Sequence, residues 1–385
     1  MAEDRQDDAP RALRRRLLFV PGFDPRRPTV YHDMWVEGAA AEAEALGADI
    51  AVGPRRRVGR DGLEWTVETV FDGRAARTEV GLLRWDDLVR ELWIKGDVRA
   101  ILETPVWAGG FLRSGVFAMA RRAARPLYLC LLTPPVILGL LVLAMLLIAA
   151  GAALIHPLAG LAVLAVSPFA VVAGWKLADR WINTNWLVQC FSHVVRAKAD
   201  PPPALVARTA DFAERILAAA DEPDVDEVLV VGFSLGANLA ARAVGEALAA
   251  RPDLGRGRVA VNLLTLGQSL NIYRRLPGDP AFDAAFDRVA TDRSVGWVDA
   301  TSATDPASTC GLDPLDGLGL KAPGRPERRA PRFHKVLTPE RYRAIRRDPN
   351  AFHFQYLKAV DVAGGYDWFR IAAGPDLLVE RVAGR

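Results

Sequence analysis

A serine stands between two glycines in Gly232-Phe233-Ser234-Leu235-Gly236, directly after an apolar run and before an alanine-rich segment. The run at 228–231 reads as a strand buried on both faces, and residues 237–250 read as a helix. In such a strand-turn-helix the glycines let the two backbones pass closely, and the turn lifts the serine hydroxyl above the end of the strand. The helix N-terminus favours negative charge nearby. The pattern predicts Ser234 as a nucleophile, and an ordinary tight turn is the alternative.

Residues 231–238 resemble the nucleophile elbow of the α/β-hydrolase superfamily, particularly its esterase and lipase branches. The resemblance covers the strand expected at Leu17 and most of the chain from about Leu205 to the C-terminus. It implies an α/β fold, with a mostly parallel sheet and helices on both faces, and a serine hydrolase that cleaves carboxylic esters. It also implies the chain order nucleophile, acid, histidine. It does not account for a long apolar segment inserted ahead of Ser234.

A serine nucleophile needs a base to take its proton, and two histidines follow Ser234. His353 precedes an expected helix, where the family has its catalytic histidine. His334, in Arg332-Phe333-His334-Lys335-Val336, reads better as part of a strand. The resemblance therefore favours His353, and a polar residue that merely caps or covers a helix is the alternative.

The base in turn needs a carboxylate that holds its tautomer and stabilises its charged form. The strand expected at 295–299 leads into a loop that contains Asp305-Pro306. The family has its acid in a loop after a strand, which favours Asp305. Asp299 at the end of the strand stays open as an alternative, as do Asp313 and Asp316.

A tetrahedral intermediate needs two backbone N–H donors for its oxyanion. The resemblance implies that one is the N–H of Leu235, directly after the nucleophile. The other should come from the turn Val20-Pro21-Gly22-Phe23-Asp24, with Phe23 as the donor. Many family members have His-Gly at this turn, whereas this chain has Pro-Gly.

The N-terminal part of the chain contains strand and helix patterns that would position this turn. Leu17-Leu18-Phe19-Val20 predicts a buried strand, and residues 28–46 predict a helix that ends at Gly47. Three further strands are expected at 50–52, 65–71 and 78–83. Asp72-Gly73 predicts a hairpin turn between the last two, and Trp85-Asp86-Asp87 predicts a helix start with an acidic N-cap.

The segment 127–175 contains no Asp, Glu, Lys or Arg. A bilayer core takes roughly 20 apolar residues per helix, so the segment predicts two membrane helices. Pro134-Pro135 is expected in the first turn of the first helix, residues 151–160 in the connecting turn, and Pro168 within the second helix. A hairpin that enters only one leaflet and a buried hairpin of a soluble protein are the alternatives.

Basic residues flank this segment, and the turn within it has none. Because positive residues stay on the cytoplasmic side, both flanks are expected there, at the bacterial inner membrane. The flanking residues are Arg113, Arg121, Arg122 and Arg125 before the segment, and Lys176 and Arg180 after it.

After the apolar segment, residues 181–199 and 204–220 predict two helices separated by Asp200-Pro201-Pro202-Pro203. The remaining chain alternates strand and helix, which is typical of a parallel sheet covered by helices. We therefore expect a tail at 1–15, hydrolase-domain parts at 16–120 and 181–385, and a membrane hairpin with basic flanks at 121–180.

Composition narrows the class of protein further. Half of the residues (51%) are hydrophobic, so a sizeable core is expected, and a net charge of +3 argues against a nucleic-acid binder. The three cysteines are scattered, the histidines are dispersed and the N-terminus lacks an apolar signal core. No metal, cofactor, disulfide or signal peptide is expected.

The sequence thus favours a membrane-anchored serine hydrolase that cleaves an ester or thioester, with a lipid or acyl chain as a candidate substrate and the bilayer as a partner. The alternative is a catalytically inert membrane-tethered interaction protein with the same fold, because a fold alone does not imply activity.

Overall fold

The apolar runs on either side of the predicted membrane hairpin form neighbouring parallel strands in the computed structural model of the chain. These are β1 (Leu13–Val20) and β6 (Glu227–Phe233), with Leu17 opposite Leu229 and Phe19 opposite Val231. The structure describes residues 11–59, 62–320 and 322–383. Of the tail expected at 1–15, residues 1–10 lie outside the described residues, and β1 already begins at Leu13.

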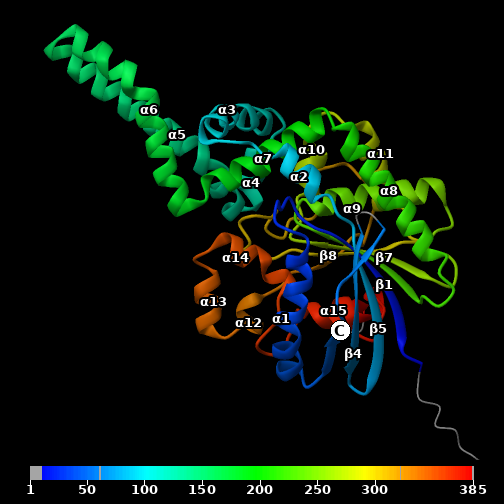
Figure 1. Cartoon of the computed structure of the whole chain (residues 1–385). Coiled ribbons are helices and arrows are strands. Elements are labelled where there is room, and N and C mark those ends of the chain that lie inside the picture. The colour runs from blue at the N-terminus through cyan, green and yellow to red at the C-terminus, as the bar shows by residue number, and fades with distance from the viewer. Residues whose placement is uncertain (1–10, 60–61, 321, 384–385) are drawn as a thin grey trace, which may run out of the picture.

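The two strands lie at the centre of a nine-stranded mixed sheet (Figure 1) with the order β2-β4-β5-β1-β6-β7-β8-β9 and β3 paired to β4. The pairs from β5 to β9 are parallel, and β2, β3 and β4 pair antiparallel. The other strands are β2 (Asp49–Val52), β3 (Arg56–Val58), β4 (Gly62–Phe71), β5 (Arg74–Leu82), β7 (Ala260–Leu266), β8 (Gly296–Ala300) and β9 (Glu327–Arg329). The predicted α/β fold with a mostly parallel sheet is confirmed.

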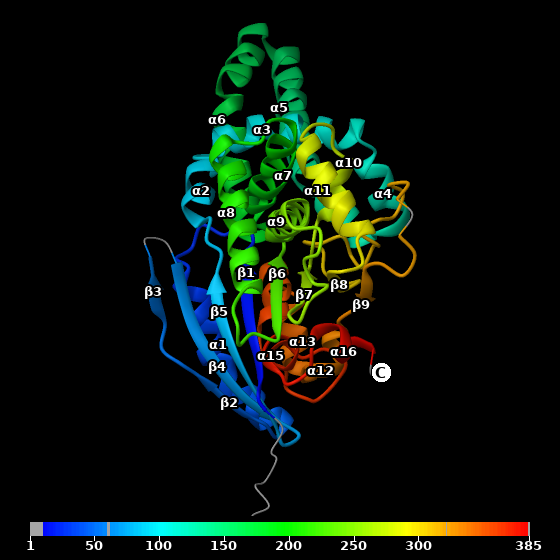
Figure 2. The ribbon, with the colours of Figure 1, turned by 90° about the vertical axis from the view of Figure 1, so that its right-hand side faces the viewer.

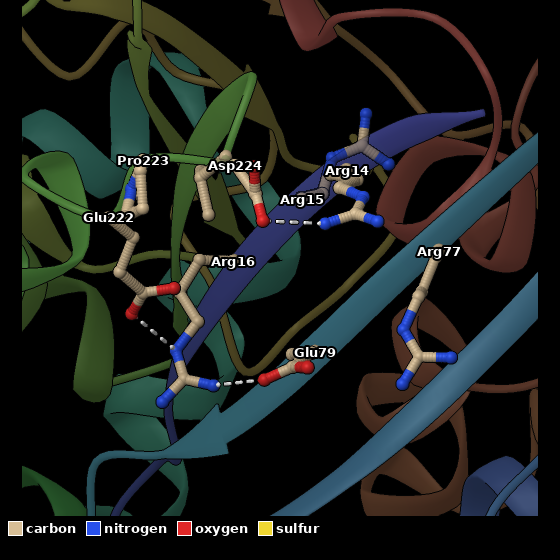
Figure 3. A pocket seen from close by; sticks show the side chains of 9 residues that line it. Arg14, Arg15, Arg16, Arg77, Glu79, Glu222, Pro223 and Asp224 are labelled. Carbon is tan, nitrogen blue, oxygen red and sulfur yellow. Dashed lines mark hydrogen bonds and ion pairs between the residues drawn. The ribbon is translucent and has the colours of Figure 1, made fainter. Parts of the chain in front are cut away.

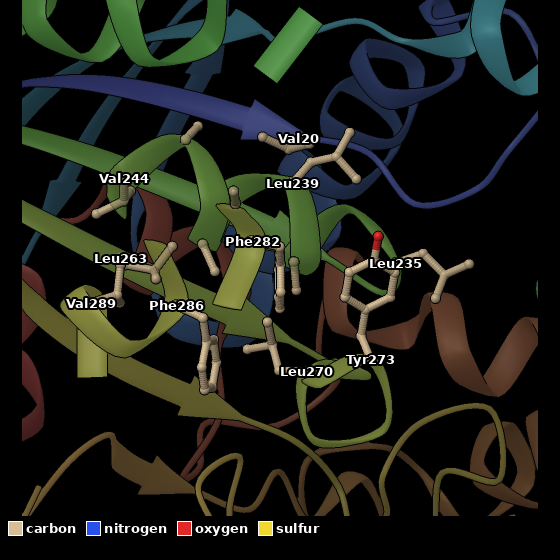
Figure 4. Packing of buried hydrophobic residues seen from close by; sticks show 14 of the residues in the cluster. Val20, Leu235, Leu239, Val244, Leu263, Leu270, Tyr273, Phe282, Phe286 and Val289 are labelled. Atoms are coloured by element: carbon tan, nitrogen blue, oxygen red, sulfur yellow. The ribbon is translucent and has the colours of Figure 1, made fainter. Parts of the chain in front are cut away.

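Helices cover both faces of the sheet. Because side chains alternate along a strand, Leu18 and Val20 of β1 join one buried cluster and Leu17 and Phe19 join the other. The first cluster packs against α8 (Pro203–Ala220), α9 (Gly236–Ala250) and α11 (Pro280–Thr291), and the second packs against α1 (Thr29–Leu46) and α15 (Trp368–Ala373) (Figures 1 and 2). Figure 4 shows part of the first cluster, in which the centre of the Phe282 ring lies 4.6 Å from that of Tyr273 and 5.9 Å from that of Phe286.

Several local predictions agree with these elements. Helix α1 ends at Gly47, which has the left-handed φ of 63°. Asp72 (φ 52°) and Gly73 (φ 74°) form the turn between β4 and β5, which is the pair of positive φ values that a type I′ hairpin needs. Strands β3 and β9 were not predicted from the sequence, because each is only three residues long and exposes polar side chains.

The apolar segment forms a hairpin of two long helices, α5 (Arg125–Ile155) and α6 (Pro157–Ile182), which projects from one end of the molecule (Figures 1 and 2). Both helices are long and apolar enough to cross a membrane, and most of their surface is exposed. Small residues let them pack closely, because a Cβ at Gly160 would lie 2.7 Å from the Ala153 Cβ. Two long, apolar, largely exposed helices suggest membrane association.

Three expected boundaries in and after the hairpin are wrong. Helix α5 begins at Arg125, with Pro126 in its first turn, so Pro134 and Pro135 lie inside it. The connection is His156 alone, because its ring accepts the Leu158 N–H (3.2 Å) and Pro157 starts α6. The helix expected at 181–199 is interrupted at Asn183, whose φ of 55° ends α6 before α7 (Thr184–Ala199) begins.

Helices α3 (Asp97–Arg113), α4 (Val116–Ala123) and α7 adjoin the base of the hairpin, and α2 (Asp86–Leu92) precedes them. The N-cap of α2 is Trp85 rather than an acidic residue, because Asp86 and Asp87 are already helical and form ion pairs with arginines. The remaining helices are α10 (Leu270–Arg275), α12 (Phe333–Val336), α13 (Pro339–Ile345), α14 (Pro349–His353), the 3-10 helix η1 (Phe354–Leu357) and α16 (Leu378–Ala383).

Candidate active site

Ser234 lies in a tight turn between β6 and α9, at the carboxyl end of β6. Its φ of 55° is unusual for a residue with a side chain and is a strained backbone conformation. Both neighbouring glycines are needed for the turn: a Cβ at Gly232 would lie 2.5 Å from the Ala237 Cα, and one at Gly236 would collide with the Pro21 carbonyl oxygen. The sequence pattern and the observed backbone therefore agree on a strained strand-turn-helix that presents Ser234.

His353 and Asp305 form a buried pair near this turn. The His353 Nδ1 lies 2.7 Å from the Asp305 Oδ2, although the residues are 48 positions apart. Asp305 follows β8 in a loop, and His353 is the last residue of α14. In the part of the chain that the structure describes, the buried His353 Nε2 has no hydrogen-bond partner. His353 and Ser234 line one cavity of about 240 Å³.

Tyr356 and a backbone amide hold the Asp305 carboxylate in place. The Tyr356 hydroxyl donates to Asp305 Oδ2 (3.1 Å), and the Ala307 N–H donates to Oδ1 (3.0 Å). The Tyr356 oxygen in turn accepts the Ser302 N–H (2.8 Å). Burial raises the pKa of Tyr356 well above its ordinary value, which keeps the phenol protonated as a donor. Sequence reasoning missed Tyr356, and its place three residues after His353 is the only local hint.

Asp299, the first alternative for the acid, faces other partners. Its Oδ1 accepts the hydroxyls of Thr265 (2.7 Å) and Thr301 (3.2 Å). Burial raises the pKa of Asp299 to about 7. Among the described residues, no hydrogen bond or ion pair joins Asp299 to a histidine. The structure therefore brings Asp305, and not Asp299, to His353.

Asp313, Asp316 and His334 make contacts of a different kind. Asp313 accepts the Leu315 N–H (2.9 Å) within a turn, and the Asp316 carbonyl accepts from Asn271. His334 is exposed on α12, which corrects the prediction of a strand there. Phe333 and Val336, which flank it, are both buried. Residues three positions apart lie on the same face of a helix but on opposite faces of a strand, so a helix brings both side chains to the core.

The turn that contains Phe23 passes directly beside Ser234. A Cβ at Gly22 would lie 3.1 Å from the Ser234 Cβ, so the glycine of Pro21-Gly22 permits this approach. Among the described residues, the backbone N–H groups of Phe23 and Leu235 donate to no other group. Both N–H groups are therefore free to donate to a ligand oxygen. The predicted role of Phe23 and Leu235 as oxyanion donors requires this.

The Phe23 side chain is packed against two aromatic rings, which fixes the position of the turn. The Phe23 ring lies 4.3 Å from the His193 ring and 5.4 Å from the Trp93 ring, nearly parallel to both. Burial lowers the pKa of His193 to about 3, so this imidazole is neutral and packs as an aromatic ring. The sequence offered no signal for His193, because the contact joins α7 to a turn about 170 positions earlier.

Two cavities meet at Ser234. The cavity shared with His353 also includes Asp24 and Arg26, which form an ion pair (2.7 Å) at its rim. The second cavity has about 30 Å³ of free space and mostly apolar walls that include Phe111, Leu127 and Ile272. Trp186 and Cys190 of α7 line both cavities. The nucleophile candidate thus stands between a partly polar opening and an apolar pocket that reaches the first turn of α5.

Tyr31 and His32, which follow the Phe23 turn at the start of α1, are both buried. The Tyr31 hydroxyl donates to Asp24 Oδ2 (3.1 Å), and the His32 Nε2 lies 3.0 Å from the Gly53 carbonyl oxygen. Tyr31 therefore supports the rim of the larger cavity from outside, and His32 joins α1 to the segment after β2.

A separate cavity of about 490 Å³ (Figure 3) lies near the amino end of β1. Ser234 follows the carboxyl end of the parallel neighbour β6, so the cavity lies at the opposite end of these strands. Its arginines are engaged, since Arg14 pairs with Asp224 (3.0 Å) and Arg16 pairs with Glu79 (3.0 Å). The described residues that line it include no serine, cysteine or histidine. Within the described ranges, no group of three or more His, Cys, Asp or Glu side chains is arranged to hold a metal ion.

Comparisons with protein-family models, curated proteins and solved structures gave no match to this chain. The α/β fold and the geometry around Ser234 are therefore the basis for any functional inference.

Proposed function

We propose that this protein is a membrane-anchored serine hydrolase that cleaves an ester or thioester. Ser234 is the nucleophile, His353 the general base and acid, and Asp305 the carboxylate that orients His353. The N–H groups of Leu235 and Phe23 stabilise the oxyanion. The α5–α6 hairpin anchors the α/β domain at the cytoplasmic face of the bacterial inner membrane.

One observation carries the proposal. The His353 Nδ1 is engaged by Asp305 at 2.7 Å, whereas its buried Nε2 is unpartnered within the described residues, and His353 and Ser234 line the same cavity. A carboxylate on Nδ1 leaves the Nε2 lone pair available, which is the tautomer that a general base needs. A hydrogen bond from Ser234 to this nitrogen is expected to form with substrate, because catalytic hydrogen bonds often tighten only in the complex.

The reaction follows from these roles. The Ser234 Oγ attacks the carbonyl carbon while its proton passes to the His353 Nε2, and the carbonyl oxygen becomes an oxyanion between the two N–H donors. When the tetrahedral intermediate collapses, His353 protonates the departing alcohol or thiol. Water then attacks the acyl-serine with His353 as base, which releases the acid and restores Ser234.

The two cavities support an acyl substrate. The apolar walls of the second cavity match the hydrocarbon part of an acyl group, and its free space of about 30 Å³ admits the atoms next to the carbonyl, so a longer chain requires these walls to move apart. The cavity with Asp24 and Arg26 suits the polar leaving group. Leu127, in the first turn of α5, lines the apolar pocket. The pocket therefore lies near the base of the proposed anchor, which favours an ester or thioester of a lipid or acyl chain.

Labelling with a fluorophosphonate tests the proposal, because such probes react with activated serines. We expect labelling of the detergent-solubilised protein, none in Ser234→Ala or His353→Ala, and weak labelling in Asp305→Asn. The matched controls are Asp299→Asn and His334→Ala, which should label like the natural protein. A folded natural protein that does not label would contradict the proposal and favour an inert membrane-tethered protein.

A further inference from the structure

Helix α3 has an apolar face that no other part of the described protein covers. Its buried face, which includes Thr104, Trp107 and Phe111, packs toward the core beside α7. Val98, Leu102 and Val106 repeat at every fourth position on the other face and are each more than half exposed; Leu102 is 66% exposed. A helix surface of this kind in water is unfavourable unless something covers it.

The charges around this face are basic. Arg99 and Arg113 are exposed near the two ends of α3, and Arg121 and Arg122 are exposed on the adjoining α4. The two acidic residues of α3 are engaged, since Glu103 pairs with Arg196 and Asp97 accepts from Asn185 (2.9 Å). An exposed apolar stripe with basic ends and engaged acids is typical of a helix that lies on an anionic bilayer surface.

The stripe lies beside the base of the hairpin, since α3 contacts both α5 and α6 there (Figures 1 and 2). Asn185 fixes this arrangement. Its amide donates to Asp97 and to Asp179 (3.0 Å), and its oxygen accepts the Trp175 indole N–H (2.9 Å). The buried Trp175 and this network join α3, α6 and α7, so α3 does not swing freely relative to the hairpin.

The position of α3 along the hairpin is also informative. Lys176 is the first charged residue of α6, and its Nζ lies 3.6 Å from the Asp97 carboxylate at the start of α3. Five residues further on, Trp181 is 83% exposed. Tryptophan and basic residues gather where a membrane helix meets the headgroups. The start of α3 therefore lies at the level where the apolar surface of α6 ends.

We propose that α3 is an interfacial helix, whose exposed stripe of Val98, Leu102 and Val106 lies in the headgroup region of an anionic bilayer beside the hairpin. The stripe continues the exposed apolar surface of α5 and α6, and the arginines complement anionic headgroups. The inference rests on entry of the hairpin into the bilayer and is independent of hydrolase activity. With α3 on the bilayer surface, the protein contacts the membrane through the hairpin and through α3. This second contact fixes the orientation of the α/β domain relative to the membrane.

Site-specific photocross-linking of the full-length protein tests this contact. The photoreactive residue p-benzoylphenylalanine replaces Leu102 in one variant, Leu147 within the hairpin in a second and Glu214 in a third, each in nanodiscs that contain phosphatidylglycerol. Glu214 is exposed on α8, away from the hairpin (Figure 1). We expect lipid adducts at Leu102 to exceed those at Glu214 by about fivefold or more, because interfacial helices bury their apolar face in the acyl boundary.

Three outcomes would overturn the inference. Adducts at Leu102 no higher than at Glu214, with strong adducts at Leu147, would show that the stripe does not touch lipid. Cross-linking of Leu102 to a second copy of the chain would show that protein covers it. Absence of adducts at both Leu102 and Leu147 would also remove the membrane anchoring on which the inference rests.

The charge contribution has its own variant. Arg99→Gln with Arg113→Gln should lower the Leu102 adducts in phosphatidylglycerol discs about threefold or more and leave those in neutral phosphatidylcholine discs unchanged, since each basic residue near the surface strengthens binding to anionic lipid. Equal adducts with and without the two arginines in phosphatidylglycerol would overturn the assignment of anionic headgroups.

Discussion

The sheet and the hairpin contain similar apolar residues, but the sheet buries them and the hairpin exposes them. Val228, Val230 and Val231 of β6 are fully buried between two layers of helices, whereas Leu154 near the tip of the hairpin is 91% exposed. Burial of apolar surface stabilises the sheet region in water. The same residue types on the outside of α5 and α6 would destabilise the protein in water and suit contact with lipid chains. Hydrophobicity alone therefore does not tell where a segment lies, and the charges around it matter as much.

The two regions also differ in their polar groups. The sheet region contains buried pairs such as Arg15 with Glu227 (2.6 Å) and His353 with Asp305, whereas the stretch 127–175 has no charged residue at all. The regions meet at Asn185, one residue before Trp186, which lines the cavities at Ser234. Chemistry is expected on one side of this joint and anchoring on the other. The following variants test that division.

The largest effect is expected from a serine-to-alanine change in the sheet region, and the same change in the hairpin is its control. Ser234→Ala should lower turnover of a water-soluble ester by about 10⁴-fold or more, because loss of the nucleophile removes the covalent route. Ser167→Ala removes a hydroxyl that donates to the Leu164 carbonyl within α6 and should leave turnover unchanged. Esterase assays in detergent measure both. A comparable loss from Ser167→Ala would break the division between the two regions.

A charge should be costly in the hairpin and tolerated on the surface of the sheet region. Leu147→Arg adds a guanidinium to an exposed position of α5 and should disfavour membrane insertion by about 3 kcal/mol. Val362→Arg, at an exposed loop position, should change stability by less than about 0.5 kcal/mol. Fractionation of membranes measures the first effect and thermal unfolding the second. Full retention of Leu147→Arg in the membrane would argue that the helices lie in water or protein.

A buried carboxyl group should make the stability of the sheet region depend on pH. Burial, together with the nearby Asp367 carboxylate, raises the pKa of Glu42 from 4.5 to about 10. Because the folded-state pKa is raised, the protonated Glu42 stabilises the fold at low pH, and this contribution is lost as the pH rises from about 4.5 toward 10. Glu42→Gln cannot ionise and keeps an oxygen for the Val360 N–H, which donates to Glu42 at 2.6 Å.

We expect Glu42→Gln to be more stable than the natural protein at pH 9 by about 1 to 3 kcal/mol, and equal to it near pH 4. Chemical denaturation at both pH values measures this difference. The control is Glu37→Gln, an exposed position of the same helix, which should show no such dependence. An equal gain at both pH values would point to packing rather than ionisation.

The smallest effect is expected at the joint itself. Asn185→Ala removes the amide that bridges Asp97, Asp179 and Trp175, and should destabilise the protein by about 1 to 2 kcal/mol. Asn185→Asp should be at least as damaging, because it replaces a donor with a negative charge between two carboxylates. Thermal unfolding in detergent measures both. If Asn185→Asp were as stable as the natural protein, the contacts of Asn185 would not hold the two regions together.

Short-range patterns account for most of what could be predicted. The elbow needs a buried strand, two glycines and a helix within about twenty residues, and each part is visible in 228–250. The hairpin is visible because uncharged length is itself the signal. Boundaries were harder to predict: Pro134 and Pro135 are good helix starters, yet Pro126 starts α5 earlier, and Asn183 ends α6 in a left-handed conformation that asparagine only sometimes adopts.

The sequence by itself therefore determined the strained turn at Ser234, the alternation of strands and helices that is typical of a mostly parallel α/β sheet, and the two long apolar helices, since residues close together in the chain set all three. Only the tertiary structure decided which carboxylate meets His353. Asp299 and Asp305 are six positions apart, but the strand turns Asp299 toward Thr265 while the following loop carries Asp305 to His353. The contacts of Tyr356, His193 and α3 were likewise beyond the sequence, because each depends on packing between segments distant along the chain.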